Sequence, residues 1–396
     1  MHAHGVRVLI VFDKFKGSLG AMQACELAAR ALRAGHRDWQ LDLCPLTDGG
    51  DGFAGILTRA GGGRLVPLAA AGPRGGWVDA SLGLVPATGI PSPARALLRL
   101  ADSAAASGKP VAVVEMAAAS GLQLLSTSQQ DPWQTTTQGT GQLMRAAAEL
   151  GAGTIVLGVG GSATNDLGLG ALAALGIEFR TGDGGRIGPP VPALWPRIER
   201  IEGEVFPQVP PIHIACDVTN PLLGPRGAAA VYGPQKGLRP EELPRLEAAM
   251  ARLAGMLCAQ WGRPPALVDT PGAGAAGCLP FGLLVAAGAR LVPGFELVSA
   301  WLDLPSRIAA ADVVITGEGS FDETSLSGKG PGAVALRASA DGRAVHVFAG
   351  RIAGMAPRAG WRLHALAPAG VPLEQAQREA ADRLVHCVQE AFARPA

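Results

Sequence analysis

The sequence has little net charge, few aromatic residues and no closely spaced cysteines, and these scarcities exclude several classes of protein. Its 34 basic and 33 acidic residues leave a formal charge of +1, which argues against a nucleic-acid partner. Its six cysteines form no C-x-x-C pair, so they indicate neither a zinc cluster nor a disulfide framework. The long uncharged stretch at 270–289 is broken by two prolines and several glycines, which does not suit a membrane span. We therefore expect a cytoplasmic protein without a membrane partner; monomer and homodimer both stay open.

Apolar residues and glycine are abundant. The chain is 48% hydrophobic and 17% charged, so it can bury a large core and is not intrinsically disordered. Its 55 glycines indicate many tight turns and places where the backbone can approach a ligand closely. Only five basic residues are lysines, and four of these lie in or beside glycine-containing loops. Lysines in such loops are suited to binding a phosphate through their compact ammonium groups.

The two ends of the chain share one order of predicted elements. Residues 6–12 form a continuous apolar run typical of a buried parallel strand, followed by a helix at 21–33 and a strand at 41–46. Strands and helices alternate again from residue 311 to 367, before a final amphipathic helix at 373–392. The pattern predicts one doubly wound, Rossmann-like parallel sheet built from both ends.

The middle of the chain has a different texture, with glycine- and proline-broken segments between strands at 111–115, 154–158 and 212–216. We expect an α/β fold of two domains: a discontinuous Rossmann-like domain, 1–64 and 294–396, and an inserted domain with a mixed sheet, 65–293. The active site is expected in the cleft between them. Two sequential domains split near residue 190 would fit the proline-rich stretch there, and this alternative stays open.

Four glycine-rich segments, 13–18, 48–52, 158–166 and 316–322, follow predicted strands and precede helices. Strand ends and helix N-termini in a parallel sheet offer unpaired N–H groups and positive dipole ends to anions. No segment matches a Walker A loop or a dinucleotide fingerprint, and no histidine lies in a glycine-rich motif. Carboxylates at predicted strand ends or loop turns, together with lysines and N–H groups, suit Mg²⁺ and a transferring phosphoryl group; they are Asp48, Asp166, Asp217, Glu318 and Asp322.

Nine blocks in order resemble the class I glycerate kinases, and together they span almost the whole chain. They are DKFKGSL (13–19), DGGDG (48–52), EMAAASGL (115–122), TTTQGTG (135–141), GVGGSATND (158–166), CDVTNPLLGPRGAA (216–229), YGPQKG (232–237), PGAGAAG (271–277) and TGEGSFD with GKGP (316–331). The resemblance implies ATP-dependent, Mg²⁺-assisted phosphorylation of D-glycerate, with 2-phosphoglycerate as the favoured product.

The resemblance also implies roles for residues, which we state as expectations. The catalytic candidates are Asp166, Asp48 and Lys16. The candidate metal ligands are Glu318, Asp322 and Asp217. The candidates for binding substrate or phosphate are Asp13, Ser18, Gly49, Gly160, Gly161, Ser162, Asn165, Thr137, Thr140, Lys236 and Lys329.

Three positions depart from the family's usual pattern: Lys14, Cys278 and Thr324, where serine, glycine and glutamine respectively are frequent. If Thr324 replaces a substrate-facing amide, a related small hydroxy acid becomes an alternative substrate. A hypothesis of another class is a non-catalytic sensor that binds a hydroxy acid or a nucleotide.

Overall fold

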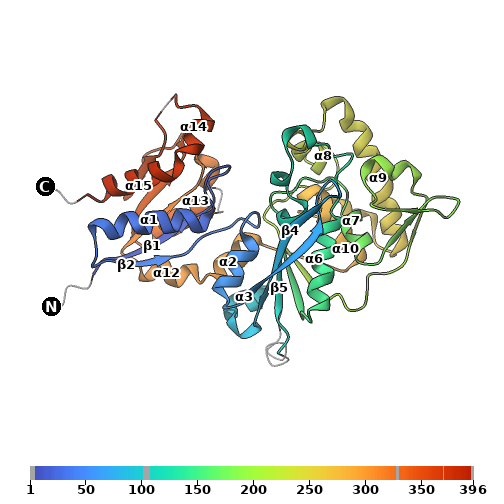
Figure 1. The fold of residues 1–396 in the computed structure, drawn as a ribbon, viewed down its shortest axis with the longest axis horizontal. Helices are drawn as coiled ribbons and strands as arrows, with labels where there is room; N and C mark the ends of the chain where they lie inside the picture. The colour runs from blue at the N-terminus through green and yellow to red at the C-terminus, as the bar shows by residue number, and fades with distance from the viewer. Residues whose placement is uncertain (1–4, 101–107, 327–329, 369, 394–396) are drawn as a thin grey trace. The chain divides into compact units, whose positions relative to one another are not determined.

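The computed structural model describes residues 5–100, 108–326, 330–368 and 370–393, and the chain divides into two compact units (Figure 1). Unit 1 joins Met1–Asp48 to Val298–Ala396, and unit 2 comprises Gly49–Leu297. Unit 1 contains a parallel sheet and unit 2 a mixed sheet. The predicted fold class, a discontinuous parallel-sheet part with an inserted mixed-sheet part, is confirmed.

The five-stranded sheet of unit 1 has the order β16-β14-β12-β1-β2, and every neighbouring pair is parallel. Its strands are β1 (Arg7–Phe12), β2 (Gln40–Leu43), β12 (Val313–Gly317), β14 (Ala344–Ala349) and β16 (Trp361–Ala365). A separate parallel pair joins β13 (Ser320–Phe321) to β15 (Arg351–Ile352). The helices are α1 (Ala21–Gly35), α12 (Leu304–Ala310), α13 (Gly330–Ala340), α14 (Leu373–Arg378) and α15 (Ala380–Ala391).

Helices cover the sheet of unit 1 on both faces. Alternate residues of β1, Val8, Ile10 and Phe12, join the apolar core under α1 and α15, which pack side by side (Figure 1). The crossover β1-α1-β2 runs toward one edge of the sheet and the crossover β12-α13-β14 toward the other. Because parallel crossovers are right-handed, the opposite directions place α1 and α13 on opposite faces.

The six-stranded sheet of unit 2 has the order β11-β10-β6-β5-β4-β3; its first four strands are parallel, and β4 and β3 are antiparallel. The strands are β3 (Arg64–Ala71), β4 (Trp77–Val85), β5 (Val111–Glu115), β6 (Thr154–Gly158), β10 (Ile212–Ala215) and β11 (Arg290–Val292). A small antiparallel sheet contains β7 (Glu178–Arg180), β8 (Arg186–Ile187) and β9 (Arg200–Glu202).

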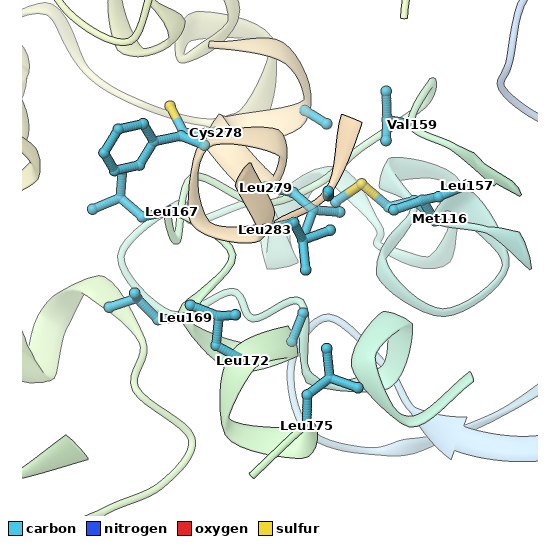
Figure 2. Packing of buried hydrophobic residues seen from close by; sticks show 14 of the residues in the cluster. Met116, Leu157, Val159, Leu167, Leu169, Leu172, Leu175, Cys278, Leu279 and Leu283 are labelled. Carbon is cyan, nitrogen blue, oxygen red and sulfur yellow. The ribbon is translucent and has the colours of Figure 1, made fainter. Parts of the chain in front are cut away.

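The core of unit 2 is built from small helices and short loops around the parallel strands. Figure 2 shows Leu169, Leu172 and Leu175 close to Leu279 and Leu283 of another helix. The helices are α2 (Phe53–Ala60), α3 (Ser92–Leu97), α5 (Ala117–Ser120), α6 (Gln138–Glu149), α7 (Leu169–Ala174), α8 (Ala228–Tyr232), α9 (Leu243–Gln260), α10 (Leu279–Ala286) and α11 (Gly294–Trp301).

Several details differ from the sequence-based expectations. Residues 49–64, which we assigned to the first domain, fall in unit 2, because α2 packs against β3, β4 and β5. Residue 190 lies inside unit 2. The expected single helix at 373–392 is two helices separated at Glu379. Within the described parts of the chain, no helix is long and apolar enough to cross a bilayer.

Candidate active site

Three neighbouring strands of unit 1 each end in a carboxylate. Asp13 follows β1, Glu318 follows β12, and Asp48 follows the segment after β2, which stays paired with β1 as far as Leu46. The chain order reverses between β1 and β12, so this is the topological switch point of the sheet. Open parallel sheets bind their ligands outside the carboxyl ends of the strands at such a point. We call Asp13, Asp48 and Glu318 the acidic group.

The acidic group holds more negative charge than one nearby cation neutralises. Lys14 Nζ donates to Asp48 Oδ1 at 3.1 Å. Burial raises the pKa of Asp13 to about 7; the charges of Asp48 and Glu318 add to the rise, and Lys14 opposes it. Burial also raises the pKa of Glu318, although a hydrogen bond from Ser325 opposes the change. A carboxylate with a pKa near 7 is suited to general-base chemistry at neutral pH.

The loop after Asp13 carries the predicted Lys16 and Ser18. Lys16 is exposed, whereas the Ser18 hydroxyl donates to the carbonyl of Phe15 at 3.0 Å and so stabilises the turn. Gly17 has a left-handed φ of +76°, and a Cβ there would lie 2.4 Å from Gln377 Nε2. The loop is therefore held against α14, with Lys16 left accessible.

A pocket of about 640 Å³ lies beside this loop within unit 1. It spans the carboxyl ends of the sheet, since Gly319, Gly350 and Ala365 at the ends of β12, β14 and β16 line it. Lys16 and Arg351 also line the pocket. The carboxyl edge of this sheet thus combines an open cavity, two cations and the adjacent acidic group.

In unit 2 the predicted glycine loops pack against one another. The Gly160 N–H donates to the carbonyl of Gly49 at 2.9 Å, and the Leu122 N–H donates to the carbonyl of Gly161 at 2.8 Å. A Cβ at Gly160 would lie 2.6 Å from the Cα of Gly50, so the backbones touch. The Gly160 amide that we predicted for a phosphate is used inside the protein, and the isolated bridge from Ser162 to Gly121 joins the same loops.

Asp166 is fully buried and accepts hydrogen bonds from four donors. Its Oδ2 accepts from the N–H and hydroxyl of Thr137, at 2.7 and 2.8 Å, and from the Gly170 N–H at 3.2 Å, while its Oδ1 accepts from the Gly168 N–H at 3.1 Å. Burial raises the pKa of Asp166, and the donors from Thr137 oppose the rise. The carboxylate ties the start of α6 to the start of α7.

Other predicted binding residues of unit 2 belong to the same interior. Lys236 is 1% exposed, and its Nζ donates to the Thr164 carbonyl at 2.7 Å and to Asn165 Oδ1 at 3.3 Å. Burial lowers the pKa of Lys236 to about 8. The Thr140 hydroxyl bonds with that of Ser120 at 2.8 Å. We call Asp166, Thr137 and Lys236, with the backbone groups that they bind, the Asp166 network.

Two of the three predicted metal ligands, Glu318 and Asp322, lie near one another in unit 1. Glu318 belongs to the acidic group, whereas Asp322 Oδ1 accepts from the N–H and hydroxyl of Thr324 at 2.8 and 2.5 Å. Asp217 lies in unit 2, where its Oδ2 accepts from the Phe295 N–H at 2.8 Å. Among the residues that the structure describes, no three His, Cys, Asp or Glu side chains form a metal site by themselves. Lys329 lies outside the described residues.

Two residues of these sites were missed in the sequence analysis. Arg351 lines the pocket of unit 1, and its position two residues after the end of the apolar strand β14 was the available signal. Glu115 ends β5, and its carboxylate accepts from the N–H groups of Gly52 and Ala54 at 3.2 and 3.1 Å. This carboxylate caps the start of α2 and joins two of the resemblance blocks.

Comparison with known proteins identifies the family. A family model described as the glycerate kinase family matches residues 8–394. The chain is 36% identical over 392 residues to the glycerate kinase of Bacillus subtilis (strain 168), covering 95% of this chain and 94% of that protein. It is 34% identical over 341 residues to the glycerate 2-kinase of Escherichia coli (strain K12), covering 83% and 81%.

A solved structure agrees with these relatives. The crystal structure of a candidate glycerate kinase 2 from Salmonella typhimurium LT2 superposes with a TM-score of 0.74 at 32% identity, covering 98% of this chain and 97% of that one. The likeness therefore extends over both units. From its sequence and its fold alike, this chain belongs to the glycerate kinase family.

Proposed function

We propose that this chain transfers the terminal phosphoryl group of ATP to a hydroxyl of D-glycerate, with Mg²⁺ and with 2-phosphoglycerate as the product. Membership of the glycerate kinase family supports the reaction class, and the name of the E. coli relative supports the 2-hydroxyl. The observation that carries the proposal is the acidic group, in which burial and neighbouring charge hold Asp13 near neutral pKa at the switch point.

Asp13 is the group best suited to orient the attacking hydroxyl and accept its proton. Its side chain is 7% exposed, so little water competes for the carboxylate, and its pKa of about 7 lets it both accept and release a proton near neutrality. Phosphoryl transfer otherwise depends mainly on positioning and on neutralising charge. This assignment makes Asp13, which the sequence analysis predicted to bind substrate or phosphate, the base in place of the catalytic candidates Asp166 and Asp48.

Glu318 and Asp48 are the residues that would hold Mg²⁺. The ion is usually bound by one or two protein carboxylates, with phosphate oxygens and water completing its shell. The acidic group fits that requirement because it brings carboxylates together; burial, with a smaller contribution from neighbouring carboxylates, raises the pKa of Asp13 and of Glu318. A bound Mg²⁺ would neutralise charge on the phosphates; Lys16, exposed beside the group, would do the same as a point charge.

The Asp166 network has a different role in this proposal. Asp166 and Lys236 lie in the interior with hydrogen-bonding groups already engaged, so we assign them to holding the loop 158–166 in shape. Thr137 and Thr140 act in the same way from α6. Such residues position a site without touching the reacting atoms.

A direct assay tests the proposed function. Purified protein is incubated with ATP, Mg²⁺ and D-glycerate, ADP release is measured, and the product is identified by ³¹P NMR against 2- and 3-phosphoglycerate. We expect ADP release that depends on D-glycerate and a signal from 2-phosphoglycerate. Release with another hydroxy acid alone would overturn the substrate; the absence of release with every acid tested would overturn the kinase activity.

A further inference from the structure

The pocket of unit 1 has two chemically different parts. Its floor is apolar and belongs to the core under α1 and α15: Phe15, Leu366 and Ala380 are 2%, 4% and 6% exposed. Its cationic part comes from Lys16 and Arg351, both exposed side chains. An apolar floor with a cationic side matches a ligand that has a flat apolar group at one end and phosphates at the other.

The rim of the pocket is formed by α14, which also combines apolar and polar side chains. Leu373, the first residue of α14, lines the pocket and is 72% exposed, so the rim offers an apolar surface to a ligand. Ala376 and Gln377 of the same helix also line the pocket, and the Gln377 amide donates to the Lys16 carbonyl at 3.1 Å. The helix α14 therefore connects the apolar wall to the cationic loop.

The size and the apolar lining of the pocket favour a ligand larger than glycerate. At about 640 Å³ it lies within the roughly 300–1,000 Å³ range of sites that enclose drug-sized ligands. Glycerate has three carbons and no apolar surface to place against Leu366 and Ile352, whereas a purine nucleoside has both the size and a flat apolar base.

The pocket also lies next to the acidic group. Glu318 directly precedes Gly319, which lines the pocket, and the Asp13 N–H donates to the Gly317 carbonyl at 3.0 Å. The Gly350 and Arg351 N–H groups donate to the Glu318 and Gly319 carbonyls at 3.2 and 3.1 Å, so the same backbone joins both regions. Phosphates that extend from the pocket past Lys16 would meet the carboxylates proposed for Mg²⁺.

We infer that this pocket binds the nucleoside part of the phosphoryl donor, with the base between Leu366 and α14 and the phosphates beside Lys16 and Arg351. The inference rests on the proposed function for the identity of the donor. It adds the location of the nucleotide, and it assigns binding residues, Arg351 and Ala376, outside the nine blocks of the family resemblance.

Substitutions on α14 test the location. Ala376→Trp places a large side chain at a half-buried position that lines the pocket, and Glu374→Trp places it at an exposed position of the same helix that does not. We expect calorimetric titration with ADP and Mg²⁺ to show at least tenfold weaker binding for Ala376→Trp and a change below twofold for Glu374→Trp. Equal affinities in the two variants, both folded by circular dichroism, would overturn the location.

An exposed cation provides a second test that does not depend on how Ala376→Trp folds. Arg351→Gln should weaken ADP binding about tenfold and leave the affinity for adenosine unchanged, because only the phosphates would face the guanidinium. Unchanged ADP binding would overturn the assignment. The glycerate assay separates the two proposals: a wild-type protein inactive on glycerate whose ADP binding depends on Arg351 refutes the substrate and supports the pocket. A protein that is active on glycerate and whose ADP binding does not change with Arg351→Gln or Ala376→Trp supports the substrate and refutes the pocket.

Discussion

The acidic group of unit 1 and the Asp166 network of unit 2 use the same residue types in opposite ways. In both, carboxylates follow buried parallel strands and lie near a lysine. Asp166 is fully buried and accepts from four donors, whereas Asp13 accepts from one local N–H at 2.7 Å and faces the charges of Asp48 and Glu318. Asp166 therefore stabilises the fold. Asp13 is destabilised by burial and by neighbouring negative charge, which a bound cation would offset.

The difference lies in what each carboxylate gains from the folded protein. Donors that converge on Asp166 compensate for its lost hydration, so its removal leaves buried N–H groups without an acceptor. Asp13 is buried next to like charges and accepts few hydrogen bonds, so its lost hydration is not replaced and its pKa is raised. Replacing the two residues by asparagine should therefore have opposite effects on stability, and the predictions below depend on that contrast.

The largest effect is expected on the rate, from Asp13→Asn. Loss of the proton acceptor should lower kcat about a thousandfold, within the roughly 10²–10⁴-fold range of general-base catalysis, while the melting temperature rises because a like charge is removed. Steady-state assays and thermal unfolding measure both. Asp341→Asn, at a surface carboxylate paired with Arg337, is the control and should change neither. A thousandfold loss accompanied by unfolding would contradict the contrast.

Asp166→Asn should lower the free energy of unfolding by about 3 kcal/mol, because an amide donor would face N–H groups that now meet a carboxylate. The fraction that stays folded should keep most of its turnover. Urea titration gives the stability, and activity per folded molecule gives the turnover. Asp183→Asn, in an exposed turn with Thr181, is the matched control and should change little. Full stability with a thousandfold loss of kcat would return the role of base to Asp166.

Lys16→Met should lower kcat/KM for ATP about a hundredfold, close to 3 kcal/mol of lost charge stabilisation. Stability should stay within about 0.5 kcal/mol, since surface substitutions away from packed features change it little. Lys109→Met, which removes the same charge from an exposed position in unit 2, controls for net charge. Kinetics equal to wild type would show that Lys16 is only a solvated loop residue.

The smallest effect concerns pH. The pKa of Asp13 is raised from its ordinary value to about 7, so the folded state binds the proton more tightly than the unfolded state. Its contribution to stability is complete below the unfolded pKa and is lost as the pH rises through about 7. The free energy of unfolding of the wild type, minus that of Asp13→Asn, should therefore fall as the pH rises from 5 to about 7, by at most about 1.4 kcal/mol per pH unit, and level off above pH 7.

Two buried histidines change the free energy of unfolding in the opposite direction, at lower pH. Burial lowers the pKa of His213 and of His346 to about 4, so their contribution is lost as the pH falls below the ordinary range for histidine. Both histidines are present in the wild type and in Asp13→Asn, so their contributions cancel when the two free energies of unfolding are subtracted. Urea titrations of both proteins from pH 5 to 8 measure the difference, and a flat difference would contradict the assignment for Asp13.

The sequence by itself determined much of this protein. The buried strands β5 and β6 have the predicted bounds, because continuous apolar runs and glycine boundaries are local signals. The order of strands and helices at the two ends was enough to predict the parallel sheet, and the order of the motifs was enough to predict the family. The prediction that carboxylates follow strand ends was also local, and Asp13, Asp48 and Glu318 lie there.

Only the tertiary structure decided which of those carboxylates are available for chemistry. In the sequence Asp166 and Asp13 both lie in glycine-rich segments, and Lys236 and Lys16 each precede a glycine. Their exposure depends on what packs over each loop from distant parts of the chain. The donors to Asp166 come partly from Thr137, 29 positions away, and the wall of the pocket comes from α14, more than 300 residues after Lys16. Burial and hydrogen-bond compensation are properties of such long-range contacts, so no local pattern can specify them.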